Sequence, residues 1–576
     1  MDYFLAGKYK NALEGYGALI SDLHPMIYTP SSEVASDIAK LDFDIQQFLT
    51  HIECPGDAST RASRFEDLGR TFFARWIAKG SIPDLENSIK NLQAALKMTQ
   101  PGAPLQTARQ AGLSQAMRAK VIASNDKGYT DVYIQSLQDL LQSTGSKYLL
   151  PLAEAYGIRW IQFRDAEDLD KYSDLLQEVL DLHSSRGDLR RRPLRLLGQS
   201  YVTKHEVTGD LGYLDACFEL YQEALDIPAN TIAATIGRAL VLRDLGEAFR
   251  TRYLRLGDPK DAELSLRWCE EAVNIIPVES SPMIQFSLKS SLASCYAVRF
   301  GQLQSIVDID ISIRIMVDAL RILPENEPFH SSGNLQLAQL FQARYVQRED
   351  IGDLDQIVSL SKKAAGNGPH NRKSEIQLLH ISAKALNSRY RQLGHSEDID
   401  ESIEKISKAL SLTQDQDETF QPELLETLAN SYEFKYKRLL SRGDLEMAIS
   451  YRKQIIALLP IGHSELPTAY SALGSLYDDK SEITKAEEDY EMTLQTYQKA
   501  VDAALENDPT RILSLQYLGI EYQKRFQRLK IQSDLDTATR TLEKAFRQPQ
   551  APKILQLHTR PLLKYFPYSL NLLHGP

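Results

Sequence analysis

The segment Leu335-Gln-Leu-Ala-Gln-Leu-Phe-Gln-Ala-Arg-Tyr345 is apolar on one helical face and ends in a basic residue followed by an aromatic one. Similar segments end at Phe300, Tyr390 and Tyr436. The basic positions of these and related segments are Arg252, Arg299, Arg344, Arg389, Lys435, Lys480 and Arg525, which lie 47, 45, 45, 46, 45 and 45 residues apart. Recurrence at such a period indicates an array of small structural repeats.

The series continues toward the N-terminus, with less regular members. Lys204, Arg159 and Arg75 follow at intervals of 48, 45 and 84 residues, and we interpret the last interval as two repeats. Lys204 and Lys480 lack the aromatic neighbour. The repeat around Arg118 to Leu141 shows the pattern least.

A turn signature follows the basic–aromatic pair in most repeats. Its members are Gly209-Asp210, Gly257-Asp258, Gly352-Asp353-Leu354-Asp355, Gly394 with Asp398-Ile399-Asp400, Gly443-Asp444-Leu445 and Asp534-Leu535-Asp536. Glycine just past a helix end takes the left-handed conformation without a Cβ penalty, and aspartate caps the next helix. Each repeat is therefore predicted to be helix, turn, helix. On this interpretation Gly443→Val strains a left-handed turn and destabilises its repeat.

The second helix of each repeat carries pairs of alanine and a larger residue, which allow close helix approach. These pairs are Ala95-Leu96, Ala224-Leu225, Ala272-Val273, Ala319-Leu320, Ala409-Leu410, Ala500-Val501 and Ala545-Phe546. Proline then often closes the repeat, at Pro228, Pro277, Pro324, Pro460 and Pro509. Apolar residues at helical spacing, without a sustained alternating run, predict an all-α fold.

The predicted architecture is a right-handed α-α superhelix of about eleven helix-turn-helix repeats with a period near 45 residues. Residues 1–64 are expected to form an N-terminal helical cap, 65–547 the repeat array, and 548–576 a C-terminal tail or cap. Stacked helix pairs of this kind present an extended concave surface.

Composition excludes several classes of protein. The chain of 576 residues has 43% hydrophobic and 25% charged residues, which is typical of a folded protein, and a net charge of −11. That charge opposes nucleic-acid binding, and we expect the basic run Arg186 to Arg195 to be a solvated loop and helix start. Cys54, Cys217, Cys269 and Cys295 are expected to be buried or half-buried thiols. No signal peptide or membrane span is apparent, so a cytoplasmic protein is expected.

The order Leu428-Ala429 with Tyr432 resembles the tetratricopeptide repeat (TPR), as does Ala319 followed by Pro324, although the TPR period is about 34 residues. Arg525-Phe526 with Asp534-Leu535-Asp536, and Arg389-Tyr390 with Asp398-Ile399-Asp400, more closely resemble fungal TPR-like proteins with aromatic di-alanine repeats. The resemblance covers roughly residues 65–547 and implies an interaction scaffold. Many relatives continue into a caspase-like CHAT protease domain with a His–Cys dyad. No cysteine follows Gln550, so that domain is not expected here.

No P-loop, dinucleotide-binding glycine motif, nucleophile elbow or His-Glu-x-x-His motif is present, and the eleven histidines are scattered. We therefore expect no enzyme, no catalytic residue, no cofactor and no metal. The basic series has two interpretations, a ladder for an acidic partner or ion pairs with the acids of the adjacent turns. Their regular recurrence favours the second.

The resemblance also suggests a clamp for an acidic chaperone tail. Asn430 occupies the expected asparagine position, but Glu426 occupies that of the lysine and would repel a carboxylate.

The predicted function is a protein–protein interaction scaffold that holds a protein or peptide in its concave groove. The alternatives are a regulatory partner of a CHAT protease or signalling complex, and an accessory enzyme with a site in the groove. The sequence names no partner-binding residue, partner or oligomeric state.

Overall fold

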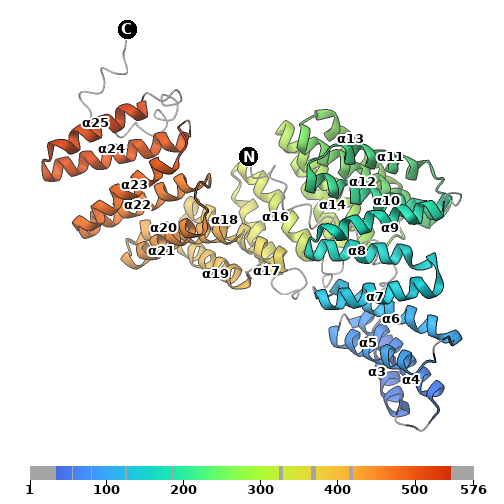
Figure 1. Ribbon diagram of the computed structural model, residues 1–576. Helices are drawn as coiled ribbons and strands as arrows, with labels where there is room; N and C mark the ends of the chain where they lie inside the picture. The colour runs from blue at the N-terminus through green and yellow to red at the C-terminus, as the bar shows by residue number, and fades with distance from the viewer. Residues whose placement is uncertain are drawn as a thin grey trace. The chain divides into compact units, whose positions relative to one another are not determined.

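The computed structural model describes residues 34–546 apart from 53, 55, 80, 101, 124–125, 184–186, 324–328, 365–371, 414–419 and 507. Every regular element in these described residues is helical, which confirms the all-α prediction (Figure 1). The expected cap at 548–576 and most of the expected N-terminal cap lie outside the described residues, and the domain boundaries at 64 and 547 stay predictions.

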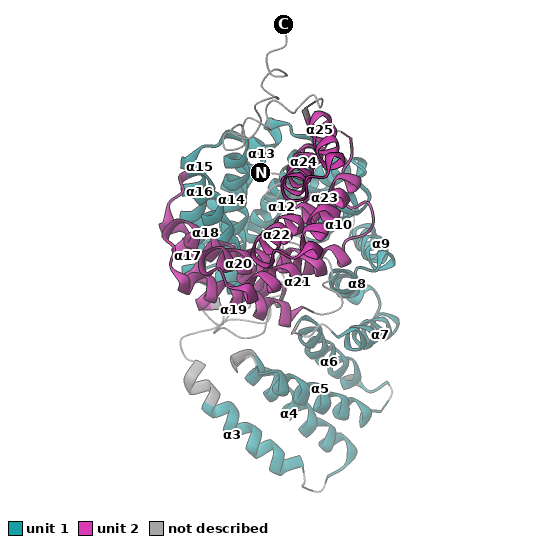
Figure 2. Ribbon diagram, turned by 90° about the vertical axis from the view of Figure 1, so that its left-hand side faces the viewer, with its two compact units in different colours: residues 1–347, 367–371 teal, residues 348–366, 372–576 magenta. Residues whose placement is uncertain are grey.

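The chain divides into two compact units near residue 347, which Figure 2 distinguishes by colour. The helices of unit 1 are α3 (Val34–Ile52), α4 (Ala58–Lys79), α5 (Ile82–Lys97), α6 (Pro104–Ala123), α7 (Lys127–Thr144), the short 3-10 helix η2 (Ser146–Tyr148), α8 (Leu149–Phe163), α9 (Ala166–Leu182), α10 (Gly187–Thr208), α11 (Gly212–Asp226), α12 (Ile232–Leu256), α13 (Pro259–Ile275), α14 (Pro282–Leu303), α15 (Ile306–Ile322) and α16 (Phe329–Arg348).

Unit 2 continues the same pattern. Its helices are α17 (Ile351–Ala364), α18 (Arg372–Leu393), α19 (Ser396–Leu412), α20 (Gln421–Leu439), α21 (Arg442–Leu458), α22 (Leu466–Thr484), α23 (Glu487–Ala503), α24 (Pro509–Leu529) and α25 (Gln532–Phe546). Within each unit an even-numbered helix pairs with the next odd-numbered one, except at α16 and α17, which belong to different units. We call them the A helix and the B helix of a repeat.

Each A helix meets its B helix at a small residue. A Cβ added at Gly198 of α10 would lie 2.4 Å from the Tyr221 ring of α11, and one at Gly474 of α22 would lie 2.8 Å from the Tyr497 ring of α23. The alanines predicted on the B helices are also buried, and Ala95, Ala224, Ala319 and Ala500 have no exposed surface. These contacts let the helix backbones approach closely, as the sequence predicted. Pro509 is an exception, because it begins α24 instead of closing a repeat.

In the turn between an A helix and its B helix, the residue five positions after the basic residue of the repeat has a left-handed conformation. Glycine takes this place at Gly209, Gly257 and Gly394, as predicted. Elsewhere a residue with a side chain adopts the same conformation, with φ between 52° and 59°. These residues are Arg164, Gln304, Glu349, Leu440, Lys485 and Lys530.

The interpretation of Gly443 is therefore wrong. The left-handed residue of that repeat is Leu440, and Gly443 lies inside the first turn of α21, which Ser441 caps. Gly352 likewise lies inside α17. Both glycines follow the left-handed residue of their turn by three positions. Leu440 and Glu349 adopt that conformation instead.

Two glycine substitutions should consequently have opposite effects on stability. A Cβ at Gly443 meets only Ser441 Oγ at 3.8 Å, so Gly443→Ala should raise the free energy of unfolding by about 0.5–1 kcal/mol. Gly394 has φ 74°, and a Cβ there would lie 2.6 Å from Arg438 Nη1. Gly394→Ala should lower the free energy of unfolding by about 1–2 kcal/mol. Urea denaturation of both variants tests this, and destabilisation by Gly443→Ala would contradict the helix assignment.

Candidate functional site

The recurring basic residues pair with acids in the first turn of their own B helices. In six repeats an arginine donates through Nε and Nη2 to both carboxylate oxygens of an aspartate nine residues later, at 2.5–3.0 Å. The pairs are Arg75–Asp84, Arg159–Asp168, Arg252–Asp261, Arg299–Asp308, Arg389–Asp398 and Arg525–Asp534. At Arg252 the partner is Asp261, while Asp258 of the Gly-Asp turn caps the helix. Pairing within the repeat, the second interpretation, is thus confirmed for these six repeats, although at Arg252 the partner is not the aspartate of the Gly-Asp turn.

Most of the same basic residues also contact the preceding B helix, which the sequence did not reveal. The carboxylate lies 28 to 35 residues earlier, with nitrogen–oxygen distances of 2.5–3.0 Å. These pairs are Arg75–Asp42, Lys120–Glu86, Arg159–Asp131, Lys204–Asp170, Arg344–Asp310, Arg389–Asp355, Lys435–Asp400, Lys480–Glu446 and Arg525–Glu491. We call the whole set the ion-pair ladder.

Lys120 is the ladder residue of the repeat that the sequence left unclear. It lies 45 residues after Arg75 and 39 before Arg159, which divides the interval of 84. Its own B helix offers Tyr129 in place of aspartate, and Lys120 Nζ lies 5.3 Å from the centre of that ring. A cation–π contact therefore replaces the ion pair.

The ladder is occupied by the chain's own acids. Pairing with Asp168 and Asp131 raises the pKa of Arg159, and Arg389 and Arg525 behave likewise through Asp398 and Asp534. A partner would have to displace these intramolecular bonds. A binding surface is therefore expected among side chains that do not recur.

Such side chains lie where one A helix meets the next, on what we call the A-helix face. Its charged residues in unit 1 include Glu66 of α4, Arg109 and Arg118 of α6, Glu154 of α8, Arg192 and Arg195 of α10, and Arg243, Asp244, Glu247 and Arg250 of α12. Glu154 accepts from Arg118 and Arg192, and Asp244 accepts from Arg195 and Arg243. Arg109 likewise donates to Glu66, so six arginines stand beside four carboxylates in a chain that is acidic overall.

The basic run Arg186 to Arg195 is not the solvated segment that was expected. Arg186 lies outside the described residues, but α10 contains the other arginines. Arg191 donates to the carbonyls of Ala224, Ala234, Ile227 and Pro228, around the end of α11. The run was misjudged because its partners lie some 30 to 50 residues away in sequence.

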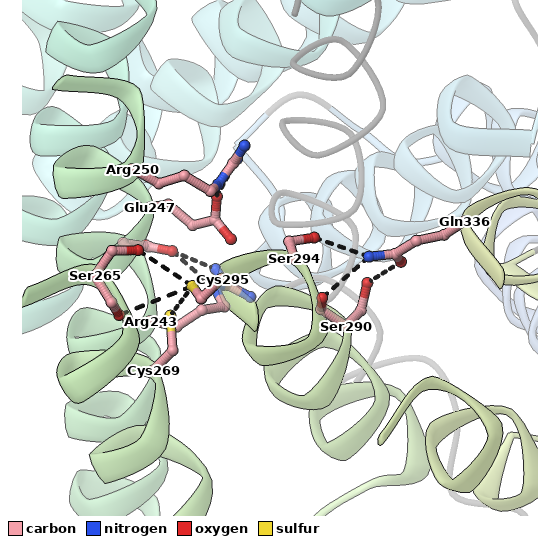
Figure 3. Close-up of polar contacts among 10 residues, drawn as sticks. Arg243, Glu247, Arg250, Ser265, Cys269, Ser290, Ser294, Cys295 and Gln336 are labelled. Carbon is pink, nitrogen blue, oxygen red and sulfur yellow. Dashed lines mark hydrogen bonds and ion pairs between the residues drawn. The ribbon is translucent and has the colours of Figure 1, made fainter. Parts of the chain in front are cut away.

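Further along unit 1 the A-helix face is polar and uncharged, as Figure 3 shows. Ser290 and Ser294 of α14 turn toward Gln336 of α16 and hydrogen-bond to it. Cys295 turns the other way, with its sulfur 3.3 Å from that of Cys269 on α13.

Three of the four cysteines are buried, as predicted, namely Cys217, Cys269 and Cys295, whereas Cys54 is exposed. Burial raises the pKa of Cys217, and the hydrogen bond with Cys295 together with burial raises that of Cys269. Thiols held in the protonated form are poor nucleophiles.

The A-helix face of unit 2 has the opposite charge. Its acids are Glu423, Glu426 and Glu433 of α20, Asp478 and Asp479 of α22, and Glu521 of α24. The lysines beside them are Lys384 of α18, Lys437 of α20 and Lys524 of α24. Six carboxylates therefore meet three ammonium groups from the A helices.

Carboxyl pKa values reflect this excess of negative charge. Burial is the largest cause in each case, and neighbouring acids add to it. The pKa of Glu423 is raised with the help of Glu465, and that of Asp479 with the help of Asp478. For Glu521, burial and Asp478 together raise the pKa to about 7. Crowded, partly buried carboxylates of this kind are stabilised by an added cation.

The predicted clamp position holds a different arrangement. Arg452 of the B helix α21 donates to Asn430 Oδ1 at 2.5 Å and lies within 4 Å of Glu426 and Glu433. It is only 7% exposed and stands where α11 and α23 carry Tyr221 and Tyr497 in the A/B contact. Asn430 is thus engaged by an arginine of its own repeat.

One open cleft, of about 580 Å³, lies on α17 and α18 and is lined by Asp355, Val358, Ser359, Lys362, Lys363 and Arg389. Lys362 contacts Glu401, and Arg389 is bonded to Asp355. A serine–lysine pair, Ser361 and Lys405, is close to the cleft at 3.0 Å but does not line it. Ser361 is 3% exposed, so this serine faces the helix packing and not a substrate.

No family model matches the chain, and no curated protein matches it. Solved structures with similar helical repeats include a human IFIT1 dimer with m7Gppp-AAAA, at 13% identity over 90% of this chain and 95% of that one, with a TM-score of 0.39. A tetratricopeptide repeat protein from Parabacteroides merdae is 13% identical over 64% of this chain and 98% of its own, with a TM-score of 0.30. A putative kinesin light chain from Podosopora anserina with TPR-like repeats is 16% identical over 38% and 99%, with a TM-score of 0.29.

Removing one ion pair of the ion-pair ladder should destabilise the repeat that contains it. Arg525→Leu leaves Asp534, 4% exposed, without its bidentate partner, and should cost about 2–3 kcal/mol because Arg525 itself is 20% exposed. Replacing both residues by leucine should restore most of that loss. The control Arg321→Leu breaks an exposed pair with Asp318 and should cost less than about 0.5 kcal/mol. Equal losses in urea denaturation of Arg525→Leu and Arg321→Leu would refute the structural role of the ladder.

Glu521 should make unit 2 less stable as the pH rises. Its folded pKa, about 7, lies above the ordinary glutamate value of 4.5, so the folded state holds the proton more tightly than the unfolded state. The stability from this group is complete below pH 4.5 and is lost through pH 7. Glu521→Gln should therefore raise the melting temperature more at pH 8 than at pH 5. A pH-independent difference from wild type would show that Glu521 titrates normally.

Proposed function

We propose that this protein is a non-catalytic scaffold that binds a protein partner, through a peptide segment or a domain, on its A-helix faces. The observation that carries the proposal is the contrast between two sets of positions. The ladder positions recur with the same chemistry and are occupied within the chain. The A-helix positions change from arginine-rich in unit 1 to acidic in unit 2, as contact residues do when construction does not fix them.

The charges of the two A-helix faces indicate which segments of a partner each face would bind. Arg192, the part-exposed arginine of the unit 1 face, favours an acidic segment of the partner, and the carboxylates of the unit 2 face favour a basic one. Among the described residues, none of the helices has both the length and the apolarity that a membrane span requires.

Catalysis has less support than binding. The open cleft on α17 and α18 is lined by paired charges, and the nearby Ser361–Lys405 pair is buried. A regulatory role beside a caspase-like CHAT protease, which the resemblance of the repeats implies, is one form of the scaffold function. Recovery of such a protease with the chain would identify it.

Affinity purification from native lysate with the full chain as bait, followed by mass spectrometry, tests the scaffold function. We expect partners in stoichiometric amounts whose retention falls when Glu423 and Asp479 are both changed to the amides. Glu488→Gln, on the exposed surface of the B helix α23, is the control and should retain them. A bait that retains nothing, or retains the same proteins in both variants and at high salt, would refute binding through this face.

A further inference from the structure

Buried polar atoms without a partner gather around one carboxylate of the unit 1 face. Glu154 of α8 is 4% exposed and accepts from Arg118 Nη2 at 2.7 Å and from Arg192 Nη2 at 2.5 Å. The Nε atoms of both arginines are buried and make no hydrogen bond among the described residues. The hydroxyl of Tyr172 is also buried and unbonded there. Unmet donors of this kind are costly, since their desolvation is not offset.

These groups form one cluster, because Tyr172 reaches α8 from the B helix α9. A Cβ added at Gly157, one turn after Glu154, would lie 3.2 Å from Tyr172 Cζ. Burial, and then the charge of Glu154, raise the pKa of Tyr172. Its hydroxyl therefore keeps its proton and can donate it to an acceptor. Tyr172 is 4% exposed, so bulk water does not serve that donor.

The charges of the cluster do not balance. One carboxylate faces two guanidinium groups, which leaves one positive charge in a partly buried place. A buried charge without a counter-ion is destabilising, and an anion from outside would relieve it. Guanidinium groups present planar pairs of N–H donors that match carboxylate and phosphoryl oxygens. The Arg192 side chain is 35% exposed, so the cluster is open to solvent at this residue.

We infer that Arg118, Arg192 and Tyr172 form a binding site for an oxyanion, the carboxylate or phosphoryl group of an acidic peptide segment. This inference rests on the proposed scaffold function and names the chemistry that its unit 1 face recognises. Glu154 positions the two guanidinium groups and also limits anion affinity by its own charge. The unbonded Nε atoms and the Tyr172 hydroxyl are the donors that the oxyanion would satisfy.

Three variants of the full chain separate this site from general electrostatics. Arg192→Gln should weaken binding of a fluorescent glutamate-rich peptide about tenfold, since it removes one of the charge-assisted donors. Arg190→Gln is the matched control: Arg190 lies two residues earlier on α10 but bonds Glu223 and the Leu180 carbonyl. Both remove one positive charge, so equal losses would overturn the site.

Glu154→Gln should change the affinity for the peptide in the opposite direction. It removes the competing negative charge, so binding of the peptide should tighten, and inorganic phosphate should raise the melting temperature more than in wild type. Sodium chloride at equal ionic strength is the control, and circular dichroism verifies the fold. Weaker binding by folded Glu154→Gln, or an equal shift with chloride, would overturn the inference.

Two further peptides determine whether the oxyanion is a carboxylate or a phosphoryl group. One carries serine and the other phosphoserine at a single position in the same neutral sequence. Binding of the phosphopeptide alone, lost in Arg192→Gln, assigns a phosphoryl ligand, whereas preference for the glutamate-rich peptide assigns carboxylates. If neither peptide binds and phosphate has no effect, the oxyanion site is refuted. Partners still retained on the unit 2 face would leave the scaffold function intact.

Discussion

In several repeats one basic side chain near the end of the A helix bonds acids of two other helices and so fixes the relative placement of three helices. At Arg525 the guanidinium bonds Asp534 of its own B helix and Glu491 of the preceding B helix. The planar group accepts only a narrow range of directions for these carboxylates. The crossing of A and B helices and the stacking of one repeat on the next are therefore set at the same point. The period near 45 residues is the spacing of these points along the chain.

The conformation of the turns follows from this constraint. Left-handed backbone costs a residue with a side chain roughly 1 kcal/mol, yet Arg164 and Lys530 adopt it. The ladder residue precedes the turn by five positions, and its partner on the B helix follows by four. Anchored on both sides, the turn has little freedom to relax, so the helix packing compensates for the local strain. Glycine is favourable there, as at Gly257, but is not required.

The sequence was sufficient to predict the features that recur along the chain. It was not sufficient to predict the features that differ from one repeat to the next. Helix pairs, the period and pairing within the repeat follow from spacing, because the same solution recurs many times. Lys120 was missed because its B helix carries Tyr129 in place of the acid. Gly443 was misplaced because Leu440 already supplies the turn. The charge of the A-helix faces depends on residues about 35 to 50 positions apart, such as Arg192 and Glu154, which a local pattern does not connect.

This division between repeating and varying positions also separates stability from recognition. The ladder neutralises its charges within the chain, so its arginines add little to the field that a partner meets. The A-helix face keeps unbalanced charge of one sign in unit 1 and of the other sign in unit 2. Such charge speeds encounter and excludes partners of the wrong sign more than it adds affinity. Affinity must then come from a few well-placed donors, and unmatched groups such as Arg192 Nε and the Tyr172 hydroxyl are where a ligand gains most.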